Sequence, residues 1–364
     1  MRIALLGAGH IGQTIARLLA DTGDYTVTVI DKNPAALAKL SGRGITTAVV
    51  DTEQPAALVG ALRGHDAVIN ALPYHLATLA ATQAREAGCH YFDLTEDVAA
   101  TREIKRLAEG AKTAFMPQCG LAPGFIGIVA HHLASQFDSL AEVKMRVGAL
   151  PAFPTNSLKY NLTWSVDGLI NEYCHPCEAI RDGQRIDVLP LEGLEHFSLD
   201  GTEYEAFNTS GGLGTLCETL EGKVRTLDYK SVRYPGHQAL MRVLLEELQL
   251  KQDQGTLKDI LRRAVPTTMQ DVVLVFVTVS GHKGGQFVEE VFARKIFADR
   301  SERAPLSAIQ ITTAAGICAA VDLFREGKLP QRGFIRQEQI ELPAFLANRF
   351  GSAYQQSRQV ESIA

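Results

Sequence analysis

The fold of this chain is decided by its first twelve residues, Met1-Arg-Ile-Ala-Leu-Leu-Gly-Ala-Gly-His-Ile-Gly12. A short apolar run comes first, the glycines follow it, and apolar side chains at helical spacing then continue to Ala20. This order predicts a β-strand, a glycine turn and an α-helix. In such a turn Gly7 allows the tight bend, Gly9 lets the backbone approach a diphosphate, and Gly12 lets the helix pack closely against the strand.

The helix that begins at this turn offers backbone N–H groups and the positive end of its dipole to phosphate groups. We therefore expect a dinucleotide to bind here, contacted by the three glycines and by His10 and Ile11 at the start of the helix.

An acidic residue stands where a dinucleotide would place its adenosine ribose. Residues 26–30 are predicted as the second strand, and Asp31 follows Gly12 by nineteen positions. A carboxylate there accepts hydrogen bonds from the ribose hydroxyls but repels a 2′-phosphate, so the sequence favours NAD over NADP. Lys32 is the nearby cation that could weaken this repulsion, although a solvated loop lysine is the simpler interpretation.

Strand-like and helix-like segments continue to alternate as far as residue 117. Such alternation predicts an α/β domain with a parallel, doubly wound sheet of the Rossmann type, whose ligands bind at the carboxyl ends of the strands. Strand-end residues are therefore further candidates for the cofactor: Asp51 near the adenine, Leu72 and Pro73 near the diphosphate and ribose, and Leu121 in the turn after the last strand. For Asp51 an ordinary turn residue is an equally good interpretation.

The alternation ends near residue 122. From about residue 140 to 300 the chain contains strand-like runs, among them 143–147, 160–164, 271–280 and 286–297, separated by Asp-Gly and Gly-Gly turns. These runs predict a second α+β domain, residues 123–305, with a mostly antiparallel sheet. A long apolar helix is predicted for residues 306–326.

Composition and charge argue against several classes of protein. The net charge is −5 and the chain has no basic patch, so we expect no nucleic-acid partner. The longest apolar stretches, near 271–280 and 309–321, are interrupted and too short for a membrane span. Six dispersed cysteines and the absence of a signal-peptide pattern favour the cytoplasm. Cys174-His-Pro-Cys177 lacks a second pair of ligands, so no metal site is predicted.

Five segments, taken in this order, resemble the saccharopine dehydrogenase-like family, and most of all its bacterial L-lysine 6-dehydrogenases: Gly7–Gly12 with Asp31, Pro117–Gly124, Tyr160–Ser165, Tyr204–Phe207 and Arg233–His237. The resemblance covers nearly the whole chain. It implies that NAD oxidises the ε-amine of L-lysine to 2-amino-6-oxohexanoate, which cyclises to piperideine-6-carboxylate, with release of ammonia. It also implies that residues 306–355 return to complete the Rossmann domain of residues 1–122. We further expect a homo-oligomer of two or more chains.

This reaction needs a proton acceptor for the ε-ammonium, a cation for the α-carboxylate and an acid for the α-ammonium. Arg233 and His237 flank a Tyr-Pro-Gly turn that could direct both side chains to one cleft. We predict that Arg233 binds the carboxylate and that His237 acts as the base or positions a water molecule. Alternatively, Arg233 forms an interdomain salt bridge and His237 merely begins a helix.

Four further residues are candidates for the substrate site. Asp93 and Glu96 follow a Rossmann strand, where one of them could hold an ammonium group, although acids in a first helical turn are stabilising without any ligand. Tyr160 and Asn161 begin a run that also holds Thr163 and Trp164. If this run is a strand, two of the four side chains can line a pocket.

The sequence leaves two other functions open. One is a dehydrogenase that forms or cleaves saccharopine, which would need additional cations for the glutamate carboxylates. The other is a non-catalytic NAD-binding regulator.

Overall fold

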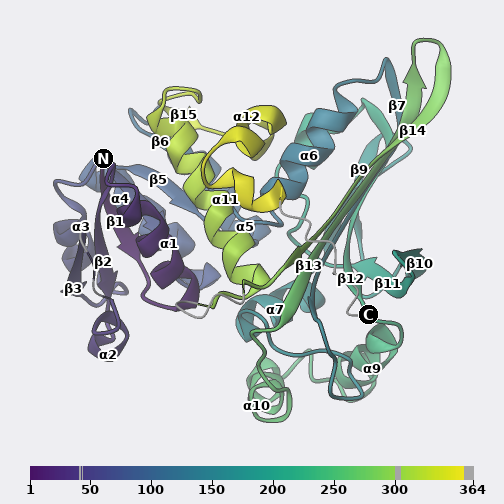
Figure 1. The fold of residues 1–364 in the computed structure, drawn as a ribbon, viewed down its shortest axis with the longest axis horizontal. Helices are drawn as coiled ribbons and strands as arrows, with labels where there is room; N and C mark the ends of the chain where they lie inside the picture. Colours follow the sequence, from purple (N-terminus) through teal and green to yellow (C-terminus); the bar gives the residue numbers. More distant parts are fainter. Residues whose placement is uncertain (41, 43, 300–304, 356–364) are drawn as a thin grey trace, which may run out of the picture. The chain divides into compact units, whose positions relative to one another are not determined.

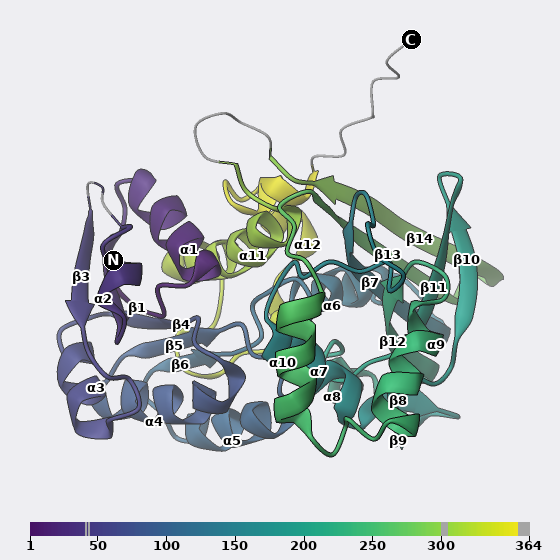
Figure 2. The ribbon, with the colours of Figure 1, turned by 90° about the horizontal axis from the view of Figure 1, so that it is seen from below.

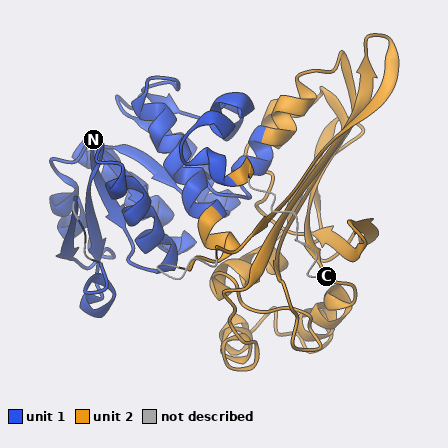
Figure 3. Ribbon diagram, viewed as in Figure 1, with its two compact units in different colours: residues 1–128, 312–353 blue, residues 129–311, 354–364 orange. Residues whose placement is uncertain are grey.

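The structure is a computed structural model that describes residues 1–40, 42, 44–299 and 305–355 (Figure 1). The chain forms two compact units (Figure 3). Unit 1 comprises Met1–Ile128 and Thr312–Ala353, and unit 2 comprises Val129–Ile311 with the described residues that follow 353. The tail therefore belongs mainly to the same unit as the amino terminus.

Unit 1 is built on a seven-stranded parallel sheet with the order β15-β6-β5-β4-β1-β2-β3. The strands are β1 (Arg2–Leu6), β2 (Thr26–Asp31), β3 (Ile45–Val49), β4 (Ala67–Asn70), β5 (His90–Asp93), β6 (Ala114–Met116) and β15 (Gly333–Phe334). The first six follow the doubly wound order of a Rossmann fold. The predicted fold class is thus confirmed for this unit.

The helices of unit 1 cover both faces of this sheet. They are α1 (His10–Asp21), α2 (Pro34–Leu37), α3 (Pro55–Leu62), α4 (Ala77–Ala87), α5 (Val98–Ala108), most of α11 (Ala308–Arg325) and α12 (Leu342–Ala347). Short 3-10 turns lie at Tyr74–Leu76, Gln337–Gln339 and Gly351–Gln355. Figure 2 shows α3, α4 and α5 below the sheet and α1 and α11 above it. Apolar side chains of α3, α4 and α5 form one core with Leu6, Val68 and Phe115 of the strands.

Helix α11 is the long apolar helix that the sequence predicts for residues 306–326. Its 18 residues and mean hydropathy of 1.2 would suffice by length and composition to cross a membrane. However, 78% of it is buried within the structure, which is typical of a core helix. Gly316 of this helix packs closely against the backbone of Cys119 and Gly120. A Cβ added to Gly316 would lie 2.8 Å from the Gly120 oxygen.

A buried carboxylate fastens the tail to the start of β2. Asp322 in α11 is 1% exposed and accepts hydrogen bonds from Tyr25 Oη (2.6 Å), Asn348 Nδ2 (2.8 Å) and Arg349 Nη2 (2.7 Å). These donors outweigh the burial and lower the pKa of Asp322 to about 2. The tail is thus held in unit 1 by a charged group as well as by apolar packing.

We expect Asp322→Asn to lower the free energy of unfolding by about 2–4 kcal/mol at neutral pH, because it removes the charge that pairs with Arg349. The folded-state pKa lies below the unfolded value of about 3.9, so this stabilisation is present above about pH 4 and is lost as the pH falls towards 2. Urea unfolding at pH 6.5 and pH 3 measures both effects.

Glu103→Gln is the matched control, because Glu103 forms an exposed pair with Arg106 on one helix, and its loss should change the stability far less than Asp322→Asn does. The difference in stability between wild type and Asp322→Asn should shrink at pH 3. An equal difference at both pH values would contradict the assigned pKa.

Unit 2 contains an eight-stranded sheet that is antiparallel except for the β12–β7 pair. Its strands are β7 (Ser139–Pro151), β8 (Cys177–Arg181), β9 (Gln184–Val188), β10 (Glu195–Leu199), β11 (Thr202–Asn208), β12 (Val224–Arg233), β13 (Asp271–Lys283) and β14 (Gln286–Phe297). The main path runs β10-β11-β12-β7-β13-β14, and β8 with β9 branches from β12. This confirms the predicted α+β class with a mostly antiparallel sheet.

Helices pack on one face of this sheet. Those that lie in unit 2 or enter it are α6 (Phe125–Ala134), α7 (Val166–Cys174), α8 (Leu216–Leu220), α9 (His237–Arg242), the π-helical turn Val243–Glu247 and α10 (Gln254–Ala264). Apolar residues of α7, α9 and α10 join Tyr160 and Phe207 in one core. The predicted strand at 160–164 is wrong: this segment is irregular, and only Leu162 forms an isolated bridge, to Thr267.

Alternate residues of β12 point to opposite faces of the sheet. Asp228 and Lys230 share one face with Arg146, which pairs with Asp228 Oδ1 at 2.6 Å, and Lys230 pairs with Glu195 at 2.7 Å. Arg233 points to the other face, towards α7. The buried charges of the first face are therefore already paired with one another, whereas Arg233 belongs to a separate environment.

Candidate dinucleotide and substrate sites

The glycine turn of unit 1 has the close contacts that the sequence predicts. Gly7 has φ +99°, and a Cβ there would lie 2.8 Å from the Ala71 oxygen. A Cβ on Gly12 would lie 2.0 Å from the Gly7 oxygen, so only glycine permits this approach of α1 to the strand. A Cβ on Gly9 would meet nothing within 4 Å, and it would occupy open space at the start of the helix.

That open space is suited to a phosphate. Gly9 is the N-cap of α1, no side chain caps the helix, and its first turn holds no acidic residue. The first N–H groups of α1 therefore remain available to an anion, as the pyrophosphate of NAD(P) requires. His10 is exposed and Ile11 is half-buried at the same point, so both can stand beside a ligand there.

Asp31 ends β2 beside the glycine turn. Its Oδ2 accepts a hydrogen bond from the Ala8 N–H at 2.7 Å, and its Oδ1 accepts one from the Asn33 N–H at 2.8 Å. Lys32 forms an ion pair with Glu53, both side chains being exposed, so its charge is engaged with Glu53. Asp31 thus keeps a carboxylate at the place where the adenosine ribose is expected.

The other strand-end residues show several environments. Asp51 is exposed, and its Oδ1 accepts from the Glu53 N–H at 3.1 Å, as in an ordinary Asx turn. The Leu72 N–H donates to Asn70 Oδ1, and Pro73 is exposed before a 3-10 turn. Leu121 is only 5% exposed. The cofactor roles of Asp51, Leu72, Pro73 and Leu121 stay predictions.

Asp93 is enclosed by the protein, whereas the sequence analysis expected it at a strand end that is open to a ligand. It is fully buried and accepts hydrogen bonds from Tyr91 Oη (2.8 Å) and from the N–H groups of Thr95 (3.0 Å) and Gln118 (2.8 Å). Burial raises its pKa to about 6, although these donors oppose the shift. Because Asp93 is enclosed and already accepts three hydrogen bonds from the protein, the geometry favours a structural role, and its predicted contact with an ammonium group stays a prediction. Glu96 is half-buried in the same loop, and its predicted role stays open.

In unit 2 three side chains form a directed chain of hydrogen bonds. Arg233 Nε donates to Tyr173 Oη at 2.9 Å, and the Tyr173 hydroxyl lies 3.1 Å from His237 Nε2. His237 Nδ1 lies 2.8 Å from the Leu158 carbonyl oxygen, which can only accept. The proton of His237 is therefore on Nδ1, and Nε2 accepts from the tyrosine. The predicted neighbours Arg233 and His237 are indeed brought together, through a tyrosine that the sequence analysis did not name.

The charges around these hydrogen-bonded side chains determine whether His237 can act as the base. Burial and, after it, the Arg233 charge lower the pKa of His237 to about 3. His237 is therefore neutral at ordinary pH, and its one lone pair is engaged with Tyr173. This arrangement suits a positioning role better than that of a general base.

Arg233 is 3% exposed and lies against aromatic rings, with its Cζ 5.0 Å from the centre of Tyr160 and 5.8 Å from that of Tyr173. It forms no ion pair with a carboxylate among the residues that the structure describes. Burial lowers the pKa of Arg233, but Tyr173, Tyr160 and, after them, the charge of Glu172 raise it above its usual value. A buried cation without a carboxylate partner is a natural receptor for an anionic group.

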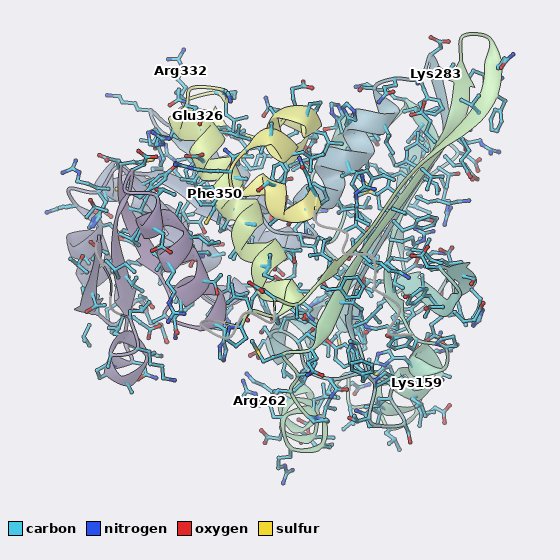
Figure 4. All side chains as sticks on the ribbon, in the orientation of Figure 1. Lys159, Arg262, Lys283, Glu326, Arg332 and Phe350 are labelled. Atoms are coloured by element: carbon cyan, nitrogen blue, oxygen red, sulfur yellow. The ribbon has the colours of Figure 1, made fainter. Side chains whose placement is uncertain are left out.

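Unpaired polar atoms lie in the segment that begins at Tyr160. The Tyr160 hydroxyl, Asn161 Oδ1 and Thr163 Oγ1 are buried and lack a hydrogen-bond partner among the described residues. The Tyr160 ring also contacts the His237 ring, at 5.3 Å between centres. Lys159, labelled in Figure 4, donates from Nζ to the Pro235 oxygen at 2.9 Å and joins this segment to the turn before His237.

Glu205 is a second residue that the sequence analysis missed. It is 2% exposed and accepts from the N–H groups of Gly236 (2.7 Å) and Gln238 (2.6 Å), so it fixes the turn between Arg233 and His237. Glu205 lies within the Tyr204–Phe207 segment quoted for the resemblance, which was the available signal. No comparable signal marked Tyr173.

The described cysteines are all buried, with raised thiol pKa values; burial raises that of Cys177 to about 12. The described residues contain no cluster of three or more His, Cys, Asp or Glu side chains that could hold a metal ion.

A glycine turn at the N-terminus of a helix, on a sheet of this strand order, defines unit 1 as a dinucleotide-binding domain. Unit 2 adds a mostly antiparallel sheet with a buried arginine that has no carboxylate partner among the described residues, so the class is a dinucleotide-binding protein of two units. The family descriptions "Saccharopine dehydrogenase NADP binding domain" and "Saccharopine dehydrogenase C-terminal domain" match residues 3–116 and 120–349. The chain therefore belongs to the saccharopine dehydrogenase family, and its amino-terminal part is an NAD(P)-binding domain.

Two curated relatives are similar to part of the chain. Mitochondrial alpha-aminoadipic semialdehyde synthase is 24% identical in Mus musculus and 23% identical in Rattus norvegicus, each over 195 residues. These alignments cover 51% of this chain and 21% of the relatives, so the chain spans about a fifth of the length of those proteins.

Two solved structures share the fold over almost the whole chain. Apo saccharopine dehydrogenase (L-Glu forming) from Saccharomyces cerevisiae has a TM-score of 0.77 at 18% identity and covers 94% of this chain and 96% of its own. Homospermidine synthase from Legionella pneumophila, in complex with NAD, has a TM-score of 0.67 at 15% identity and covers 97% and 89%. At these identities the likeness shows the fold alone.

Proposed function

We propose that this protein is an NAD-dependent dehydrogenase that oxidises the ε-amine of L-lysine to 2-amino-6-oxohexanoate and releases ammonia. The balanced reaction consumes lysine, NAD⁺ and water, and yields the aldehyde, ammonium, NADH and one proton. The bound cofactor would accept the hydride that leaves the ε-carbon.

The observation that carries the proposal is the buried guanidinium of Arg233, which has no carboxylate partner among the described residues. An α-carboxylate can pair with this group and compensate the cost of its burial. Tyr173 and the Val232 oxygen hold Arg233 by Nε (2.9 Å) and Nη1 (2.8 Å), which fixes the plane of the guanidinium. Nη2 has no hydrogen bond to a described residue and can donate to a ligand.

Loss of the ε-ammonium proton must precede hydride transfer, because the nitrogen lone pair supports the developing imine. A buried site that already contains the Arg233 charge disfavours a second cation. The ε-amine can therefore become neutral without a strong base. His237, neutral and fixed through Tyr173, then serves to orient the hydroxyl of Tyr173.

Arg233 is the one buried guanidinium that lacks a carboxylate partner among the described residues, and this also supports lysine over saccharopine. The buried basic side chains among the described residues, other than His237, are Arg146, Lys230 and Arg233. The first two are paired with Asp228 and Glu195 on the opposite face of the sheet. One free guanidinium matches one carboxylate, whereas saccharopine carries three.

Saccharopine dehydrogenation is the second candidate. It is favoured by the family descriptions and by the solved structure of a protein titled saccharopine dehydrogenase, with its TM-score of 0.77. A non-catalytic NAD-binding regulator is the third possibility that the sequence left open. The expected homo-oligomer and cytoplasmic location stay predictions.

The choice of NAD over NADP rests on Asp31. Its carboxylate is placed beside the glycine turn by the Ala8 N–H, and the neighbouring cation of Lys32 is paired with Glu53. A 2′-phosphate at that place would meet an uncompensated negative charge. The matching family is described as NADP-binding, so the preference for NAD is proposed for this chain on the basis of its own Asp31.

The test is an assay with four arms: lysine or saccharopine, each with NAD or NADP, followed by the absorbance of the reduced cofactor. We expect reduction with lysine and NAD, and at least tenfold lower kcat/KM with NADP. Turnover of saccharopine alone would replace our proposal by the second candidate. Tight NADH binding without turnover of either substrate would indicate a regulator.

A further inference from the structure

Gln118 is a strained residue at the carboxyl end of β6. Its φ is +65°, in the left-handed region that residues other than glycine, asparagine and aspartate seldom adopt. It lies in the Pro117–Gly124 loop and is 2% exposed. A conformation of this kind persists only where the surroundings impose it, and it is found mainly at functional sites.

The surroundings of Gln118 do impose it. Its backbone N–H donates to Asp93 Oδ1 at 2.8 Å, and the next N–H, of Cys119, donates to the Asp93 carbonyl oxygen at 2.8 Å. On the preceding side, Gln337 Nε2 donates to the Pro117 oxygen. The buried Asp93 carboxylate, which the sequence offered together with Glu96 as a candidate for an ammonium group, holds the backbone of Gln118.

The side-chain oxygen of Gln118, Oε1, is buried and has no hydrogen-bond partner among the described residues. A buried acceptor without a partner is unfavourable, as is the left-handed backbone. Two unfavourable features at one residue are expected where a ligand makes use of them.

The position in the sheet indicates which ligand. In a sheet of this order the β1-β2-β3 half binds the adenosine side of the dinucleotide, and the β4-β5-β6 half binds the other mononucleotide. Gln118 follows β6 and is tied to the end of β5. We propose that the Gln118 carboxamide binds the nicotinamide carboxamide of NAD(P), with the ligand N–H donating to Oε1.

Gln118→Gly tests this proposal by ligand binding, independently of turnover. Glycine adopts the left-handed backbone without strain, so the melting temperature should be unchanged or higher. The Kd of NADH, measured by fluorescence titration, should rise about tenfold through loss of one buried hydrogen bond. The Kd of ADP-ribose, which lacks the nicotinamide, should stay within twofold of wild type.

Gln249→Gly is the matched control, because Gln249 is an exposed glutamine in unit 2 with φ +56°. It should show the same relief of strain and unchanged affinity for both ligands. Should Gln118→Gly fail to fold, Gln118→Asn tolerates the same backbone and withdraws the carboxamide by one methylene group, so it should show the same selective loss. Unchanged NADH affinity, or equal losses for NADH and ADP-ribose, would overturn the proposal.

Discussion

Replacing Gly9 by alanine should weaken NADH binding by at least tenfold while leaving the fold almost intact. The backbone of Gly9 has φ −68° and ψ −177°, which alanine adopts freely, and the added Cβ would meet no protein atom within 4 Å. The open space at the start of α1 is where the diphosphate is expected, so the methyl group would collide with the ligand alone. Fluorescence titration of NADH and thermal unfolding measure the two effects.

Gly12→Ala should behave differently. Its Cβ would lie 2.0 Å from the backbone oxygen of Gly7, a contact that no side-chain adjustment can relieve. Helix α1 would have to move away from the strand, so we expect a loss of several kcal/mol of stability and no measurable NADH binding. The contrast between the two glycines separates ligand contact from helix packing.

Gly60→Ala is the control for the substitution itself, because Gly60 lies in α3 and an added Cβ there also meets nothing within 4 Å. It should raise stability by up to about 1 kcal/mol, through helix propensity, without changing NADH affinity. If Gly9→Ala bound NADH as tightly as Gly60→Ala does, the glycine turn would not be the diphosphate site.

The fold of the amino-terminal third could be predicted because its sequence signals are local. Each strand, turn and helix of residues 1–117 has a sequence pattern that is recognisable within a few positions. The parallel connections follow from the alternation of strands and helices. Strand β15 could not be predicted in this way. It has only the two residues Gly333–Phe334, and it exists because the distant β6 offers an unpaired edge.

The substrate site was predictable only in part. The spacing of Arg233 and His237 suggested that their side chains lie close together, because a turn of three residues limits their separation, and the structure shows both in contact with Tyr173. The surroundings of Asp93 could not be predicted, because a sequence does not show that a carboxylate at a strand end is enclosed by Tyr91 and two backbone N–H groups. Tyr173 comes from a helix sixty residues before Arg233, and only the fold brings the two together.

Replacing Arg233 by methionine should lower kcat/KM for lysine by about a hundredfold or more. The substitution keeps an unbranched side chain of similar length but removes the guanidinium that we assign to the α-carboxylate. The charge-assisted bonds to that carboxylate are made before and during the reaction, so most of the loss should appear in KM. The Kd of NADH should stay within twofold, since unit 1 is not altered.

A second substrate makes this prediction specific. Pentane-1,5-diamine is lysine without its carboxylate, so wild type should use it poorly, whereas Arg233→Met should lose little or no activity towards it. The ratio of kcat/KM for lysine to that for the diamine should therefore fall by about the same hundredfold factor, because only lysine has a group to lose contact with Arg233.

Arg181→Met is the matched control for loss of a cation from unit 2. The side chain of Arg181 is 43% exposed and lies 3.4 Å from Asp228, away from Tyr173 and His237, so its removal should leave both substrates unaffected. Equal losses for lysine and the diamine in Arg233→Met would mean that Arg233 supports the fold of the site through Tyr173 rather than binding the carboxylate. A selective loss for lysine can arise only if the guanidinium interacts with the one group that the diamine lacks.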